Sequence, residues 1–176
     1  SWLAADVSMS ISKPPKALIV PHSGYHYSGE VAAKAYRLLE PIYDNIKKVV
    51  VLGASHRDNF SGIALPGADV FHTPLGDVKV HQPSIQQLLK FDLVQERPET
   101  HRLEHSIEVQ LPFLQTVLED FELVPLIIGE CDPRELSQVL ESLWGSHETL
   151  FVISSGLSRN LPIDQVIEQD AKSAEH

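Results

Sequence analysis

Cysteine is almost absent from this sequence. Cys131 is the only one in 176 residues, so no disulfide can form within the chain, and this composition agrees with a reducing compartment. Long apolar runs are also missing, since every apolar stretch is far shorter than the roughly 20 residues that span a bilayer. The first residues lack the charged-then-apolar pattern of a secretion signal. These absences predict a soluble, cytoplasmic protein.

Basic residues are too few to balance the acidic ones. Lysine and arginine together number 14 and aspartate and glutamate 24, which gives a formal net charge of -10 and a sequence pI near 5.3. The phosphates of a nucleic acid or an anionic membrane would meet a like-charged surface, and no cluster of basic residues offsets that repulsion. We therefore expect no nucleic-acid or membrane partner, and a small molecule or a peptide as the ligand.

Three motifs of common enzyme classes are missing as well. There is no Gly-x-Gly-x-x-Gly and no P-loop, so binding of a dinucleotide or a triphosphate has no support. The Gly-x-Ser-x-Gly turn of serine hydrolases is also absent. With 43% hydrophobic and 22% charged residues, the chain is long enough for one globular domain with a substantial core.

Two short aliphatic runs each end in a polar loop that contains histidine. Residues 17–20 lead to His22, and residues 47–52 lead to His56. Apolar runs in which polar residues do not alternate with apolar ones are typical of strands that are buried on both faces. A helix capped by Ser28 is expected between them, which would make the two strands parallel neighbours. Because open α/β sheets bind ligands outside the carboxyl ends of their strands, both histidines are expected to open onto one crevice and could share a metal ion.

Periodicity and turn signals predict the remaining elements. They are strands at 62–66, 76–80, 121–128 and 149–155, and helices at 83–91, 104–118, 133–144 and from 164 onward. The first two of these strands suggest a hairpin at the sheet edge. Pro112 lies inside the helix at 104–118 and is expected to kink it, which would turn His105 inward. Strands that alternate with helices predict a single α/β domain over residues 1–176.

A third strand end is expected at the same edge. The polar loop 154–159 follows a buried-looking strand, so Ser155 and Arg159 are predicted to line the crevice. Tyr25 either lines it as well or packs under the helix that follows. A histidine after a strand is more often a hydrogen-bonded loop residue than a ligand, and that alternative stays open for His22 and His56.

His105 has two interpretations. Beside Glu104 it could act as a general acid or base, because histidine titrates near neutral pH and a neighbouring carboxylate tunes it. It could equally be a residue of the first helical turn, where flanking carboxylates favour the helix dipole, and the sequence alone favours this second interpretation. Glu104 and Glu108 are also available to orient a metal-binding histidine. Glu104 is predicted to belong to the substrate pocket as well. Cys131 is more often inert than reactive in such a position.

Five short motifs follow one another along the chain. They are Pro21-His-Ser-Gly-Tyr25 with Tyr27-Ser-Gly29, Leu52-Gly-Ala-Ser-His56, Phe71-His-Thr-Pro-Leu-Gly-Asp77, Glu104-His-Ser-Ile-Glu108 with Gln110-Leu-Pro112, and Val152-Ile-Ser-Ser155. Their order resembles that of the Memo family, whose bacterial and archaeal members are also called AmmeMemoRadiSam system protein B. The resemblance covers most of the chain.

The resemblance implies a three-layer α/β/α fold with a mixed, mainly parallel sheet, similar to the class III extradiol dioxygenases that bind non-haem Fe(II). By motif, His22 and His56 match the two metal histidines and His105 matches a histidine of the same pocket. Iron or copper is the implied metal. The third ligand would be a cysteine beyond residue 176, which Cys131 does not match. Because the sequence starts at Ser1 rather than at a methionine and stops within an expected helix, we expect it to lack N-terminal and C-terminal portions of the full family domain.

The sequence departs from the family pattern after the last strand. Where the family usually reads Ser-Ser-Asp and then histidine three residues later, this chain has Gly156 and Arg159. One hypothesis is a metal-dependent oxidoreductase of dioxygenase type, in which His105 moves protons. The alternative is a non-catalytic binding or regulatory protein, because a guanidinium in place of an imidazole suits an anionic ligand better than a metal. A zinc hydrolase is a third, less favoured interpretation.

Overall fold

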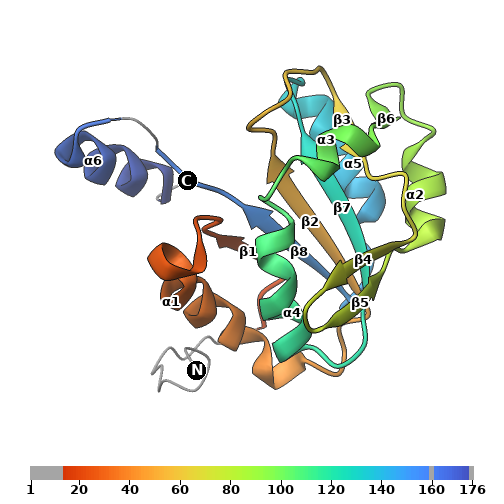
Figure 1. The fold of residues 1–176 in the computed structure, drawn as a ribbon, viewed down its shortest axis with the longest axis horizontal. Helices are drawn as coiled ribbons and strands as arrows, with labels where there is room; N and C mark the ends of the chain where they lie inside the picture. The colour runs from red at the N-terminus through yellow and green to blue at the C-terminus, as the bar shows by residue number, and fades with distance from the viewer. Residues whose placement is uncertain (1–13, 159–160, 175–176) are drawn as a thin grey trace.

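A six-stranded, mainly parallel sheet forms the centre of the molecule (Figure 1). The computed structural model describes residues 14–158 and 161–174. The strands of this sheet are β1 (Ala17–Val20), β2 (Lys48–Ala54), β3 (Ile63–Leu65), β6 (Val94–Glu96), β7 (Glu122–Ile128) and β8 (Thr149–Ser154). They lie in the order β1-β8-β2-β7-β3-β6, and only the β3/β7 pair is antiparallel.

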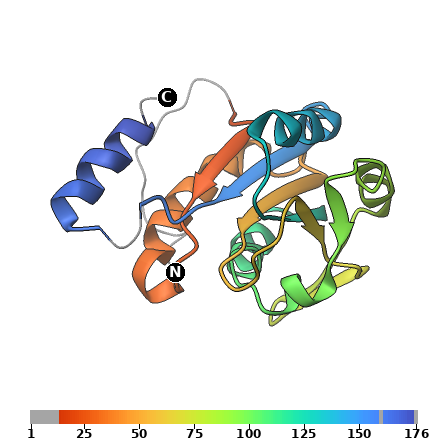
Figure 2. The same cartoon turned by 90° about the horizontal axis from the view of Figure 1, so that it is seen from above.

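Helices cover both faces of the sheet. They are α1 (Tyr25–Tyr36), α2 (Gln82–Leu88), α3 (Pro98–Arg102), α4 (Leu111–Val117), α5 (Pro133–Leu143) and α6 (Ile163–Ala174), with the 3-10 helices η2 (Arg37–Ile42) and η3 (Glu108–Gln110). Figure 2 shows α1 and α4 on one side of the sheet and α5 on the other, while α6 extends beyond the β1 edge. This arrangement confirms the expected three-layer α/β/α fold. Among the residues described, no helix combines the length and apolarity needed to cross a membrane.

Strand β2 is buried on both of its faces. Val49 and Val51 pack into the core cluster that includes residues of α1 and α4. Val50 and Leu52 pack on the opposite face, in the cluster that contains Val139 of α5. This two-sided burial explains why the sequence of the strand is a continuous aliphatic run, since a strand with one face in solvent would alternate apolar and polar residues.

The order of the strands differs from the expectation that β1 and β2 are neighbours. Strand β8 lies between them and is parallel to both, so that Val152 pairs with Leu18 on one side and with Val51 on the other. The strand that separates the first two elements of the sheet therefore comes from the C-terminal part of the chain. Local sequence patterns carry no information on such a long-range insertion, but the two strands remain parallel and both end at the same edge.

The region after β2 also differs in detail. Strand β3 belongs to the main sheet, whereas the hairpin consists of β4 (Val70–Thr73) and β5 (Gly76–Lys79) in a separate two-stranded sheet. The short elements β6 and α3 were not expected, because three- and five-residue elements are too short to show a period. Helix α1 begins at Tyr25 rather than near Ser28, and Gly24 precedes it without a side-chain cap.

The expected helix at 104–118 is wrong. Residues 104–107 are irregular, and the helical part consists of the short η3 followed by α4. Pro112 therefore lies in the first turn of α4, where its missing N–H costs nothing, and does not kink a longer helix. Glu104 accepts hydrogen bonds from the backbone N–H groups of His105 and Ser106. A carboxylate that binds its own following backbone in this way favours a turn over a helix.

Gly53 allows the irregular segment to pack directly on β2. A Cβ atom at this position would overlap the Ser106 hydroxyl and would lie 2.9 Å from Cγ1 of Ile107. Ser106 also donates a hydrogen bond from Oγ to the carbonyl of Ala54, at 3.0 Å. The close approach of these two segments brings Glu104 next to the residues that follow β2.

Substitution Gly53→Ala is expected to destabilise the fold by about 1–3 kcal/mol, because the added methyl group overpacks a buried contact. Equilibrium unfolding in urea measures the effect. Gly24→Ala is the matched control, since a Cβ there meets only Cδ2 of Tyr27 at 3.8 Å. Equal stability losses for the two variants would contradict the close packing of residues 106 and 107 on β2.

Candidate functional site

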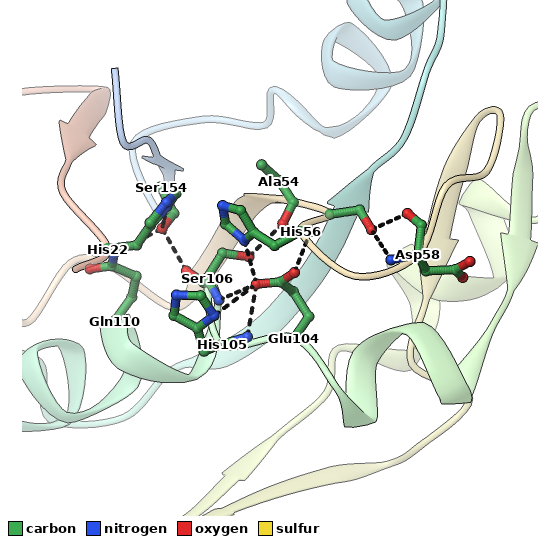
Figure 3. A network of polar contacts seen from close by, with 10 residues as sticks. His22, Ala54, His56, Asp58, Glu104, His105, Ser106, Gln110 and Ser154 are labelled. Carbon is green, nitrogen blue, oxygen red and sulfur yellow. Dashed lines mark hydrogen bonds and ion pairs between the residues drawn. The ribbon is translucent and has the colours of Figure 1, made fainter. Parts of the chain in front are cut away.

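Three imidazole rings lie together at the carboxyl edge of the sheet (Figure 3). His22 follows β1, His56 follows β2, and His105 lies between α3 and η3. The ring centroids of His22 and His56 are 4.9 Å apart, and His105 lies 5.8 Å and 5.1 Å from them, respectively. The structure therefore brings together the three histidines singled out in the sequence, although β8 separates the strands that carry two of them.

Glu104 connects two of these histidines. Its Oε1 atom lies 2.8 Å from Nδ1 of His56 and 3.2 Å from Nδ1 of His105. The same oxygen accepts from the backbone N–H groups of His105 and Ser106 at 2.8 and 2.9 Å, and Oε2 accepts from the N–H of His56 at 2.7 Å. The carboxylate thus joins the loop after β2 to the segment after α3, as Figure 3 shows.

The environment of Glu104 strongly favours its ionised form. Burial alone would raise its pKa, since only 2% of the side chain is exposed. The hydrogen bonds from the His56 ring and from the backbone of His56, Ser106 and His105 outweigh that effect and lower the pKa to about 2. An ionised Glu104 can only accept hydrogen bonds, so Nδ1 of His56 must carry the proton that it shares with the carboxylate.

A second, uncharged network contacts His22. The ring is buried, and its Nδ1 atom lies 3.2 Å from Oγ of Ser154, at the end of β8. Gln110 donates from Nε2 to the same oxygen at 2.9 Å, and Tyr36 donates to Oε1 of Gln110 at 2.9 Å. The hydroxyl of Ser154 donates to the carbonyl of Ser106 at 2.5 Å. Residues from α1, η3 and β8 therefore converge on this histidine.

The loop that carries His56 is anchored on its other side by Asp58. Thr100 donates to Oδ2 of Asp58 at 2.6 Å, and Nη2 of Arg97 lies 3.1 Å from the same oxygen. These two hydrogen bonds lower the pKa of Asp58. Ser55 donates to the Asp58 carbonyl at 2.5 Å. The loop is thus held at both sides of His56 by contacts with the α3 region.

A hollow of about 510 Å³ borders His22 and His56 on the α5 side. Its lining residues are His22, Leu52, Gly53, Ala54, His56, Ile128, Leu136, Ile153, Ser154, Ser155, Gly156 and Leu157. Half of these residues are aliphatic, and none of the described lining residues is a carboxylate, a lysine or an arginine. This combination of apolar walls and a few polar groups is typical of small-molecule sites.

The other sequence-predicted pocket residues differ in their placement. Ser155 lines the hollow, whereas Glu104 and Tyr25 do not. Tyr25 donates from its hydroxyl to the carbonyl of Val109 at 3.1 Å and packs edge-on against Phe113. Arg159 lies outside the described residues.

Cys131 is half-buried, and its surroundings disfavour the thiolate. Burial raises its pKa, and the nearby charges of Glu135 and Asp132 raise it further. A raised pKa reduces the thiolate fraction that metals and electrophiles need. This agrees with the expectation that the residue is inert.

One group of side chains in the described chain has the spacing of a metal site. Ligand atoms of His56, Glu104 and His105 lie within 4.8 Å of one another, so these residues could hold a metal ion. However, Oε1 of Glu104 already accepts from two backbone N–H groups and faces two imidazole nitrogens. The carboxylate is therefore better placed to orient the rings than to coordinate an ion itself.

The sequence match to known proteins agrees with the motif resemblance. The family model described as Memo-like protein matches residues 2–176. The chain belongs to this family. Its Memo relatives include a MEMO1 family protein of Aquifex aeolicus, 32% identical over 160 residues, which are 89% of this chain and 58% of that protein.

Two further Memo relatives come from distant organisms. Human Protein MEMO1 is 32% identical over 162 residues, which are 88% of this chain and 53% of that protein. A MEMO1 family protein of Sulfolobus acidocaldarius is 33% identical over 174 residues, which are 93% of this chain and 61% of that protein. The chain therefore spans little more than half the length of the curated relatives that it matches.

The residues that orient the histidines were mostly missed in the sequence. Ser154 and Gln110 stand in the quoted Memo motifs, but neither type of side chain signals contact with a histidine far away in the chain. The sequence offers Glu104 and Glu108 as carboxylates that could orient a histidine, and in the structure Glu104 contacts His56. The only available signal for Ser154 and Gln110 was the family motif itself.

Substitution Glu104→Gln is expected to lower the free energy of unfolding by about 3 kcal/mol at neutral pH. The folded-state pKa of about 2 lies below the ordinary value of 4.5, so the ionised group stabilises the fold above pH 4.5 and loses this effect as the pH falls toward 2. At about pH 3 the loss caused by the substitution should shrink to about 1.5 kcal/mol. Denaturant unfolding at the two pH values measures both.

Glu108→Gln is the matched control for this experiment, because Glu108 is an exposed carboxylate in the same part of the chain. It should change the stability by less than about 0.5 kcal/mol at either pH. An effect of Glu104→Gln that is the same size at both pH values would contradict the low pKa of Glu104.

Proposed function

We propose that this Memo-family chain carries the histidine part of a transition-metal site and serves a metal-dependent oxidoreductase of dioxygenase type. In this proposal Nε2 of His22 and of His56 hold iron or copper, and His105 transfers protons beside them. The observation that carries the proposal is the pair of imidazoles 4.9 Å apart, each with Nδ1 against a buried side-chain oxygen. Metal-binding histidines are commonly oriented through their second nitrogen in this way.

The separation of the two rings fits a shared ion. Histidine nitrogens bind such metals at about 2.0–2.1 Å, so two imidazoles on one ion have ring centres roughly 5 Å apart. The centroids of His22 and His56 lie 4.9 Å apart, and the rings are nearly perpendicular, with an interplanar angle of 83°. Imidazole is a suitable ligand for iron and for copper.

His105 suits the transfer of protons better than the other two histidines. Its side chain is 43% exposed, compared with 17% for His56, so it can exchange protons with solvent. Its Nδ1 lies 3.2 Å from the Glu104 carboxylate, which can balance the positive charge of the protonated ring. Its ring stacks on His56 at 5.1 Å, so it is close to any substrate that approaches the metal histidines.

The hollow beside His22 and His56 supports a small substrate with an apolar body. Leu52, Ile128 and Ile153 form part of its wall, and a charged ligand would find no described lysine, arginine or carboxylate there. A bound iron or copper ion would supply redox chemistry and polarise an oxygen-containing substrate. Catalytic metal sites usually have three protein ligands, and the Memo resemblance implies that the third lies beyond residue 176.

Substitutions His22→Ala and His56→Ala are each expected to weaken metal binding at least roughly tenfold, because each removes a ligand of the ion. Elemental analysis after anaerobic loading with Fe(II) or loading with Cu(II) gives the metal content, and calorimetry gives the affinity. His105→Ala should keep the metal content of the unaltered protein, since the ring is assigned to proton transfer.

His72→Ala provides the matched control. Its Nδ1 atom contacts a carboxylate, Asp77, in the same way as His56 contacts Glu104, but the pair lies exposed on the hairpin. Metal content that is unchanged in both His22→Ala and His56→Ala would end the proposal. Loss of metal in His105→Ala would make that residue a ligand and contradict its assigned role.

A further inference from the structure

A chain of buried polar side chains leads from α1 to the ring of His22. Tyr36 and Gln110 have no exposed surface, Ser154 is 4% exposed and His22 is 1% exposed. Buried hydrogen-bonding groups of this kind cannot exchange partners with water, so their donor and acceptor roles are fixed by one another. For each hydrogen bond among these four side chains, the donor and the acceptor can therefore be assigned in turn.

Two backbone carbonyls fix the first two steps. The carbonyl of Pro21 can only accept, and it lies 3.0 Å from the Gln110 side chain, so the amide must present its NH₂ group to it. The same NH₂ group then donates to Ser154. The carbonyl of Ser106 also can only accept, so it takes the single hydroxyl proton of Ser154.

These steps determine the protonation of His22. The oxygen of Ser154 has donated its only proton and accepts from Gln110, so it can interact with Nδ1 of His22 only by accepting a second hydrogen bond. Nδ1 of His22 must then carry a proton. In the neutral ring the lone pair is consequently on Nε2, the same arrangement that Glu104 imposes on His56.

We propose that Ser154, held by Gln110, is a positioning residue that fixes His22 in the Nδ1–H tautomer and so makes Nε2 its metal-binding nitrogen. The part that concerns metal rests on the proposed function, whereas the tautomer itself does not. The two histidines are then oriented by different means, His56 by a carboxylate and His22 by a neutral hydroxyl. A hydroxyl fixes the ring without adding a second negative charge to the buried site.

Nitrogen NMR of the metal-free protein with labelled histidine tests the tautomer directly. Two-bond proton–nitrogen correlations distinguish a protonated ring nitrogen from an unprotonated one. At about pH 8, where histidine is ordinarily neutral, His22 should show the proton on Nδ1 and none on Nε2. A proton on Nε2 of His22 in the folded, unaltered protein would overturn the proposal, whatever the variants do.

Substitution Ser154→Ala tests the positioning role. The His22 signals should shift toward a mixture of both tautomers while those of His56 stay unchanged, and Co²⁺ affinity should fall roughly 10- to 100-fold. Ser154→Thr, which restores a hydroxyl, should recover the Nδ1–H tautomer. A folded Ser154→Ala protein with an unchanged His22 tautomer would contradict the role of Ser154.

Thr149→Val is the matched control on the same strand. Thr149 is also buried, and its hydroxyl has no hydrogen-bond partner in the described part of the chain, so this variant should keep both the tautomer and the Co²⁺ affinity. Different results would contradict the proposed metal site and the proposed tautomer of His22. Absence of Co²⁺ binding in the unaltered protein would count against the metal site alone, while the NMR result decides the tautomer.

Discussion

The site depends on the hydrogen bonds that the buried carboxylate of Glu104 accepts. This carboxylate accepts hydrogen bonds from the backbone N–H groups of His56, His105 and Ser106 and from the His56 ring. It therefore links the loop after β2 to the segment before η3. Gly53 makes this contact sterically possible, because no Cβ separates β2 from Ser106. A negative charge in such a place is costly unless its donors stay in position, so these hydrogen bonds stabilise the segment despite its irregular backbone.

The central strands were predictable because their burial determines their composition. Val49, Val50 and Val51 pack alternately on opposite faces, and only a strand between two layers of helices requires apolar residues at consecutive positions. The order of the strands was not predictable, since β8 is inserted between β1 and β2 from more than a hundred residues along the chain. The helix expected at 104–118 does not begin at residue 104, because the Glu104 side chain accepts hydrogen bonds from the N–H groups of His105 and Ser106. These bonds favour a turn there over a helix.

The candidate site was also predictable only in part. Strand ends indicated His22 and His56, because parallel strands deliver their carboxyl ends to one edge whatever their order. Ser154 and Gln110 could not be assigned a role, since contacts between a hydroxyl, an amide and an imidazole follow from tertiary packing rather than from spacing. The Memo motifs include both residues but do not say what they do. The roles of Gln110 and Ser154 follow from contacts with the backbone carbonyls of Pro21 and Ser106, which only the tertiary structure brings near them.

Anomalous diffraction from metal-loaded crystals would test the account most directly, because it locates the ion relative to the individual ring nitrogens. The account predicts one ion within about 2.0–2.2 Å of Nε2 in both His22 and His56, with the hydrogen bonds of both Nδ1 atoms intact. An ion bound instead between the Glu104 carboxylate and the Nδ1 atoms of His56 and His105, or an ion far from all three rings, would contradict it.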